Sequence, residues 1–276
     1  MIVILALLTA FGAAGLNGAA AILEKAGTSK LAEIKSPNPL LLWNLKSSLP
    51  YIIGVVFDFI GWGLTLFSVH ILPLFIVQPI IACSVIVTVI IEYYLLKIKL
   101  NIQFIIALTV IILGLVLLAL TATPEKVINV NNNVNIGIAL FPVVLLILGI
   151  IFSRNTKSIN SFILAALGGL GFGGVAIAGR MIHFNHPFYQ VLLSPIVIGL
   201  IAYGLIGIIL FTIALQRSAA SSVNAIMIAC NTLFPILIGL IFLGDHPRNN
   251  LWIFVISGVL LTISGSVLVA FKFDIS

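Results

Sequence analysis

A single aspartate lies in the middle of a long apolar stretch of this chain. Residues 54–67 read G-V-V-F-D-F-I-G-W-G-L-T-L-F, and Asp58 is the only charged residue among them. A charged side chain at the centre of a bilayer-spanning helix costs about 2.5–3.5 kcal/mol even on permissive insertion scales. Ionisable residues kept at such places usually bind a proton, an ion or a polar solute. Asp58 is therefore the first candidate functional residue.

Small and polar residues recur around Asp58 at steps of three and four. They are Gly54, Gly61, Thr65 and Ser68. This spacing places them on one helical face, which suits contact with another helix or with a water-filled cavity better than contact with lipid. Two interpretations stay open. Asp58 either contacts a solute or a coupling proton, or it is a packing residue that bonds to a neighbouring hydroxyl or backbone group.

Other polar side chains within apolar stretches complete the candidate substrate-binding or coupling set. They are Asn17, Gln78, Tyr203, Asn224 and Asn231. Asn224 and Asn231 are seven residues apart and so share a helical face. Gln78 precedes Pro79, where a backbone carbonyl loses its helical partner. For Asn17, a role in hydrogen bonding between helices is an equal alternative.

Two glutamates are expected nearer to the membrane boundary. Glu24 shares a helical face with Asn17, and we expect it to form an interfacial ion pair with Lys25. We expect Glu92, one or two turns from the boundary, to extend its carboxylate toward the headgroups.

Composition assigns the chain to the membrane. Of its 276 residues, 62% are hydrophobic and only 7% charged, and the mean hydropathy is +1.32. Continuous apolar runs of about twenty residues predict helices rather than a transmembrane barrel, whose strands alternate over about ten residues. We predict an all-α polytopic protein with about nine spans: 2–23, 49–69, 73–95, 101–121, 135–152, 160–181, 191–215, 219–243 and 250–271. Segment 37–45 is expected to lie at the interface.

The net charge of +6 indicates topology rather than a nucleic-acid partner. With nine spans, one set of loops holds Lys25, Lys30, Lys35, Lys46, Lys97, Lys99, Arg154, Lys157, Arg217 and Lys272. The other set holds Lys126, Arg180 and Arg248. Excess lysine and arginine marks the cytoplasmic side. We therefore expect a cell-membrane protein with its N-terminus outside and its C-terminus in the cytoplasm.

The chain contains two similar halves. I-I-A-C-S at 80–84 matches M-I-A-C-N at 227–231, and the order of the flanking spans also matches. We predict a first four-helix repeat in 1–121, a loop and linking span in 122–159, and a second repeat in 160–276. The single linking span inverts the second repeat, which is typical of secondary transporters with a site between the halves. Tyr203 then lies near the position equivalent to Asp58.

These features resemble the drug/metabolite transporter superfamily, which includes EamA-like permeases. L-G-D-H at 243–246 keeps its glycine–acid turn, whereas L-K-I-K at 96–99 has lost it. The span number and L-P-L-F-I-V-Q-P at 72–79 are similar to the NIPA-type magnesium transporters. The resemblance implies a transporter fold. In the NIPA pattern a glycine–glutamate pair precedes the first proline by twelve residues, but here Trp62 follows Gly61.

The expected function is transport of a small polar or cationic solute by alternating access. The alternative is a magnesium or other divalent-cation transporter, in which Asp58 would bind the metal; a receptor or scaffold is a third class. The sequence holds no arrangement typical of an enzyme, and we expect no cofactor. The glycine-rich run 168–174 lacks the lysine of a phosphate loop, and the pair Gly169 and Gly173 predicts close helix packing.

Overall fold

The computed structural model describes residues 2–29, 48–71, 80–95, 101–121, 132–181, 193–242, 247 and 251–272. Within these residues the chain forms nine helices: α1 (Ile2–Thr28), α3 (Leu49–Ile71), α5 (Ser84–Leu95), α6 (Ile102–Thr121), α7 (Asn132–Ser153), α8 (Ser158–Arg180), α10 (Pro195–Arg217), α11 (Ala220–Phe242) and α12 (Trp252–Lys272). The described part contains helices and no strands, so the predicted all-α class is confirmed there.

The helices have the length and surface of membrane-spanning elements. Six of them are long and apolar enough to cross a bilayer, namely α1, α7, α8, α10, α11 and α12, while the apolar parts described for α3, α5 and α6 are shorter. Large apolar side chains cover the outer faces; Trp62 is 60% exposed and Ile253 is 78% exposed. Hydrocarbon chains solvate such faces and water does not. The chain is a multi-pass membrane protein.

The first helix is longer than the sequence predicts. We expected a span over 2–23, but α1 continues to Thr28, so Glu24 and Lys25 belong to the helix and Glu24 is buried. The prediction ended the span at the first charged residues because charge disfavours hydrocarbon. The helix continues because both side chains face other parts of the protein. The expected interfacial segment 37–45 lies outside the described residues.

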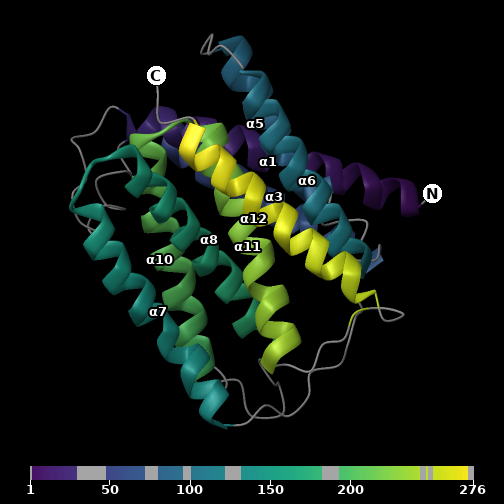
Figure 1. Ribbon diagram of the computed structural model, residues 1–276, viewed down its shortest axis with the longest axis vertical. Helices are drawn as coiled ribbons and strands as arrows, with labels where there is room; N and C mark the ends of the chain where they lie inside the picture. The colour runs from purple at the N-terminus through teal and green to yellow at the C-terminus, as the bar shows by residue number, and fades with distance from the viewer. Residues whose placement is uncertain are drawn as a thin grey trace.

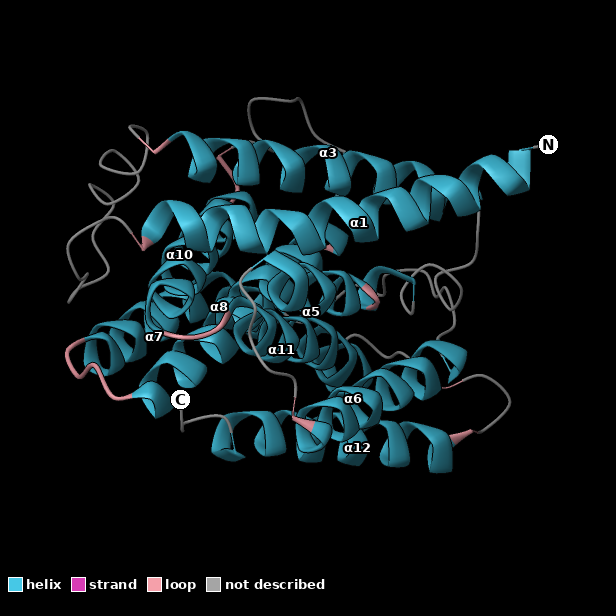
Figure 2. Cartoon of the chain, turned by 90° about the horizontal axis from the view of Figure 1, so that it is seen from above, coloured by secondary structure: helices cyan, strands magenta, loops and turns pink. Residues whose placement is uncertain are grey.

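The helices pack in three groups. Figure 2 shows α1 beside α3 along one side of the bundle and α6 beside α12 along the opposite side. Between these pairs lie α5, α8, α10 and α11. In Figure 1, α8 runs between α10 and α11 and contacts both, while α7 packs against α10 and α8. The central group therefore links the two outer pairs.

Glycines allow α8 to approach its neighbours closely. A Cβ atom at Gly169 would lie 2.4 Å from the backbone oxygen of Met227 on α11, and one at Gly171 would lie 2.8 Å from the Cα atom of Gly207 on α10. These gaps are too small for any side chain. The prediction that the glycine run serves close helix packing is confirmed.

Two helix pairs cross in antiparallel directions. On α6 and α12, Gly265 packs against Ile111 while Gly258 packs against Leu118, so residue numbers rise along one helix as they fall along the other. The same order holds for α5 and α11, where Thr88 meets Asn224 and Glu92 meets Ala220.

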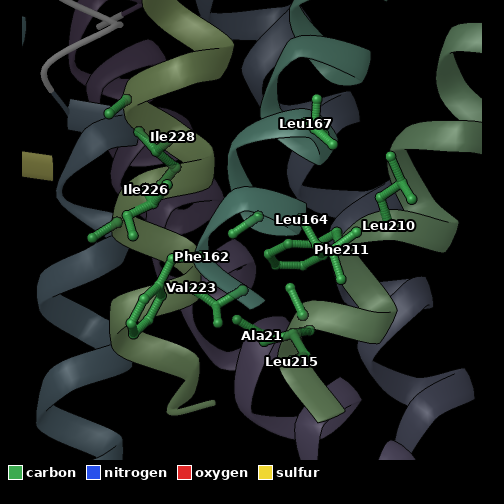
Figure 3. Packing of buried hydrophobic residues seen from close by; sticks show 14 of the residues in the cluster. Ala21, Phe162, Leu164, Leu167, Leu210, Phe211, Leu215, Val223, Ile226 and Ile228 are labelled. Carbon is green, nitrogen blue, oxygen red and sulfur yellow. The ribbon is translucent and has the colours of Figure 1, made fainter. Parts of the chain in front are cut away.

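The main hydrophobic core extends from the central helices onto α1. Figure 3 shows Leu164 of α8 near Phe211 of α10. Ala21 of α1 belongs to the same cluster as Leu215 and lies beside it. The last turns of α1 are therefore held against the core formed by the later helices.

Candidate functional site

Two carboxyl groups face each other between α1 and α3. Asp58 of α3 and Glu24 of α1 lie within hydrogen-bonding reach. Glu24 is only 5% exposed, and Asp58 is half-buried. Close approach of the helices creates this arrangement, since a Cβ atom at Gly54 would lie 2.7 Å from Cγ of Glu24. We call Glu24 and Asp58 the acid pair.

The two residues of the acid pair lie at different distances from the ends of their helices. Asp58 follows the first residue of α3, Leu49, by nine positions, which corresponds to about 13 Å along a helix that rises about 1.5 Å per residue. Asp58 therefore lies about two and a half turns inside α3, while Glu24 lies four residues before the last residue of α1, Thr28.

Asn17 lies one turn further along the same helix contact. Its side-chain oxygen is buried and has no hydrogen-bond partner. The position that a Cβ atom would take at Gly61 is only 2.0 Å from this oxygen, so the amide rests against the glycine of α3. The structure thus brings Asn17 and Asp58 into one interface, and an acceptor there is unused.

Tyr51 connects the neighbourhood of the acid pair to α10. Its hydroxyl shares a hydrogen bond of 3.0 Å with the hydroxyl of Thr212, and both residues are buried. Tyr51 thus links α3 to α10, which belongs to the second half of the chain.

Lys25 does not neutralise Glu24, contrary to our expectation of an interfacial ion pair. Its ammonium group instead donates hydrogen bonds to the backbone oxygens of Leu215 and Ser218 at the end of α10. Adjacent helical residues point about 100° apart, so Lys25 faces the second half while Glu24 faces α3. Sequence neighbours were mistaken for spatial partners.

Asn224 reaches α1 through a second polar contact. Its amide nitrogen donates to the hydroxyl oxygen of Thr88 at 3.0 Å, and that hydroxyl donates to the backbone oxygen of Gly18 on α1 at 3.0 Å. All of these groups lie in the interior, where Asn224 is only 2% exposed. Asn224 therefore joins α11, α5 and α1, and its polar atoms are used in packing.

The remaining predicted residues lie elsewhere. Tyr203 is buried against Gly174 of α8, and its hydroxyl donates to the backbone oxygen of Ile138 at 2.9 Å. Asn231 lies on α11, where its backbone contacts Gly169 and Gly173. Gln78 is outside the described residues. The structure thus gathers Asp58 and Asn17 with Glu24, but it does not bring Tyr203 into their contact.

The position of Tyr203 predicts a structural role. Tyr203→Phe removes one buried hydrogen bond to Ile138 and leaves that carbonyl unpaired, at a cost of about 1–3 kcal/mol. We expect a lower melting temperature of the purified protein in detergent. An unchanged melting temperature would contradict this structural role.

Among the described residues, no group of three or more histidine, cysteine, aspartate or glutamate side chains is suited to hold a metal ion. The acid pair still offers carboxylate oxygens, and Asn17 adds an unused amide oxygen nearby. Such hard oxygen ligands suit a proton or a hydrated hard cation rather than a soft transition metal. The chemistry available here is reversible binding of positive charge.

Sequence reasoning missed the partnership of Glu24 with Asp58. A signal was present, because Asn17 and Glu24 share one face of α1 while Gly54, Asp58 and Gly61 share one face of α3. Twenty residues, 29–48, separate α1 from α3 in the sequence, so the two helices are free to lie side by side in opposite directions. If these two helix faces are placed against each other, the carboxyl groups of Glu24 and Asp58 come together.

No protein-family model, curated protein or solved structure matches this chain.

Proposed function

We propose that the protein is a secondary transporter that moves a small polar or cationic solute across the membrane by alternating access. The observation that carries this proposal is the acid pair between α1 and α3. Glu24 and Asp58 lie within reach of each other inside membrane-spanning helices. Intramembrane carboxyl groups in such places serve proton relays and ion pathways.

Electrostatics gives the acid pair its function. Two carboxylates at close range, away from water, repel each other strongly, and one proton shared between them relieves the repulsion. A cation bound between them does the same. A purely structural contact would be met at lower cost by an amide or a hydroxyl. The acid pair therefore favours a site that gains and loses positive charge during transport.

Helix directions support the proposed inverted repeats. The sequence equates α5 with α11, through I-I-A-C-S and M-I-A-C-N, and it equates α6 with α12. Both pairs run antiparallel where they cross. Equivalent spans of two repeats inserted with the same orientation would instead run parallel. Repeats related by an axis in the membrane plane supply the two packings that alternating access needs.

Glycine contacts support the same equivalence. In the first half, a Cβ atom at Gly18 of α1 would lie 2.5 Å from the backbone oxygen of Ser84. In the second half, a Cβ atom at Gly173 of α8 would lie 3.1 Å from the backbone oxygen of Asn231. Ser84 and Asn231 occupy matching positions in the two copies of the motif. In each half, the first helix therefore packs against the same motif position near the third helix.

Transport of magnesium or another divalent cation is the second candidate. One observation favours it beyond the sequence: Glu24 supplies a second carboxylate, and magnesium typically binds through one or two carboxylates while it keeps several waters. Asn17 offers a further oxygen in the same helix contact. This candidate uses the same acid pair but predicts a different cargo.

The test begins with ligand binding to the purified protein. Amino acids, metabolites, quaternary amines and divalent metals are screened for a rise in melting temperature, because a ligand that binds only the folded form stabilises it. Compounds that stabilise are then followed into proteoliposomes, with and without an imposed proton gradient. We expect uptake of an organic solute that responds to the gradient. Uptake of magnesium alone would favour the second candidate, and the absence of any flux would contradict both.

A further inference from the structure

Residues of the first half hold the turn between α10 and α11. Lys25 donates to the backbone oxygen of Leu215 at 3.2 Å and also to that of Ser218. Gln216 donates from its amide to the backbone oxygen of Thr28 at 3.2 Å. The last turn of α1 and the last turn of α10 are thus tied to each other. From the charge distribution of the sequence we expect this end of the bundle to face the cytoplasm.

Glu92 of α5 holds the other side of the same turn. Its carboxylate accepts a hydrogen bond of 2.6 Å from the backbone N–H of Ala220, the first residue of α11. Glu92 is 1% exposed, so our expectation that it would extend to the headgroups is wrong. The unpaired N–H group at a helix start attracts a carboxylate, and this attraction keeps Glu92 inside.

The two charges match the two helix ends that they meet. Lys25 lies at the C-terminal end of α10, where backbone carbonyls carry partial negative charge, and Glu92 lies at the N-terminal end of α11, where N–H groups carry partial positive charge. The carboxylate of Glu92 also attracts the ammonium group of Lys25. Lys25 and Glu92 of the first half therefore each contact a helix end of the second half that carries the opposite partial charge.

This contact differs in kind from the apolar contact between α6 and α12. There, Gly114, Gly258 and Gly265 pack directly against the facing helix, and separation would expose close-packed apolar surface. Charged groups at the end of a helix can be hydrated when water enters, so the cost of separating them is partly recovered. The contact at the turn is thus suited to opening and closing.

We propose that Lys25 and Glu92 form a latch on the turn 217–220, which closes the cytoplasmic end of the protein in one state of transport and releases it in another. This inference rests on the proposed function. Glu24 precedes Lys25 in α1, so a shift of α1 that follows binding at the acid pair also moves the latch. The structure accordingly represents a state in which this end is closed.

A cysteine behind the latch tests it. Ser221 is buried in the first turn of α11, and Ser221→Cys provides a reporter in a chain whose Cys83 and Cys230 are replaced by alanine. Inside-out vesicles are treated with a membrane-impermeant thiol reagent. We expect Lys25→Met and Glu92→Gln each to raise the labelling rate about tenfold, a change equivalent to about 1.4 kcal/mol in the opening equilibrium.

A matched control separates opening from general loosening. Ser68→Ala removes buried hydrogen bonds to Thr9 and to the backbone oxygen of Ala6 within the first half, away from the latch. We expect the labelling rate of the Ser68→Ala variant to stay within about twofold of the rate for the Ser221→Cys protein that carries no other added substitution. Unchanged labelling in both latch variants, with melting temperatures like that of the background, would overturn the latch. Lys25→Arg, which keeps the charge, covers the case in which Lys25→Met does not fold.

Locking the contact separates this inference from the proposed function. Thr28→Cys and Gln216→Cys are combined and joined by a short bifunctional thiol reagent across the contact that Gln216 makes with Thr28. We expect at least a tenfold loss of transport in the cross-linked protein. Transport that continues at full rate after complete cross-linking would overturn the latch and leave the transporter proposal standing. If labelling of the latch variants increases but none of the proteins transports any solute, the latch is supported and the transporter proposal is contradicted.

Discussion

Uptake driven by a proton gradient is expected to fall to background when Asp58 is replaced by asparagine, while the amount of folded protein stays near that of the unchanged chain. Asparagine has nearly the same shape as aspartate and can still hydrogen-bond to Glu24 across the contact between α1 and α3. It cannot lose a proton or balance a cation. The substitution therefore removes the exchange of charge and keeps the packing. The measurement is solute uptake into proteoliposomes at a series of imposed pH differences.

Glu24→Gln identifies whether the two carboxyl groups act as one unit. If the acid pair shares a single proton or cation, the Glu24→Gln variant and the variant that combines it with Asp58→Asn should lose gradient-driven uptake to the same extent as Asp58→Asn. Residues that act together are not additive. A Glu24→Gln variant that keeps part of the gradient-driven uptake would indicate that Asp58 acts without Glu24.

The control for these variants is a polar residue that faces outward. Thr109 is exposed on α6 and donates only to the backbone oxygen of Ile105 in its own helix, so Thr109→Val should leave uptake unchanged. If Asp58→Asn transports as fast as this control and keeps its response to the gradient, Asp58 is a packing residue. That result would remove the acid pair from the mechanism.

The fold could be predicted further than the site. Apolar runs of spanning length anticipated the helices, and the glycine pair in α8 anticipated its close packing. The side-chain partners were not accessible to the same reasoning. Glu24 and Asn17 of α1 both face α3, whereas Lys25, the next residue after Glu24, faces the turn after α10. Periodicity identifies residues that share a face, but the helix opposite that face is set by tertiary packing.

Glu92 illustrates the same limit from energetics. A glutamate near the end of a span is expected to extend to the interface because burial of a lone carboxylate is costly. The start of α11 changes that balance by offering a backbone N–H at 2.6 Å. The donor belongs to a residue 128 positions away in the chain. The local sequence therefore indicates the cost of burying Glu92, but it does not reveal the N–H of Ala220 that offsets this cost.

The largest effect on folding is expected from Gly171. A Cβ atom there would meet only backbone atoms of α10, namely Cα and N of Gly207 and the oxygen of Tyr203, at 2.8–3.0 Å. Backbone cannot rotate away as a side chain can, so α8 and α10 must separate. Overpacking of this kind costs about 1–3 kcal/mol or more, which exceeds the roughly 1 kcal/mol that alanine gains over glycine within a helix. Gly171→Ala should lower the melting temperature by several degrees, and Gly171→Val should prevent accumulation of folded protein.

Gly179 supplies the matched substitution in the same helix. It is exposed, and the nearest atom to its added Cβ is Cδ1 of Leu200 at 3.9 Å, an ordinary contact distance. Gly179→Ala should therefore leave the melting temperature unchanged or raise it slightly, because only the helix propensity of alanine acts there. Opposite signs at Gly171 and Gly179 would tie the effect to the distance between α8 and α10. Equal effects would mean that α8 and α10 do not touch through Gly171 in the membrane, and the central group of helices would have to be packed differently.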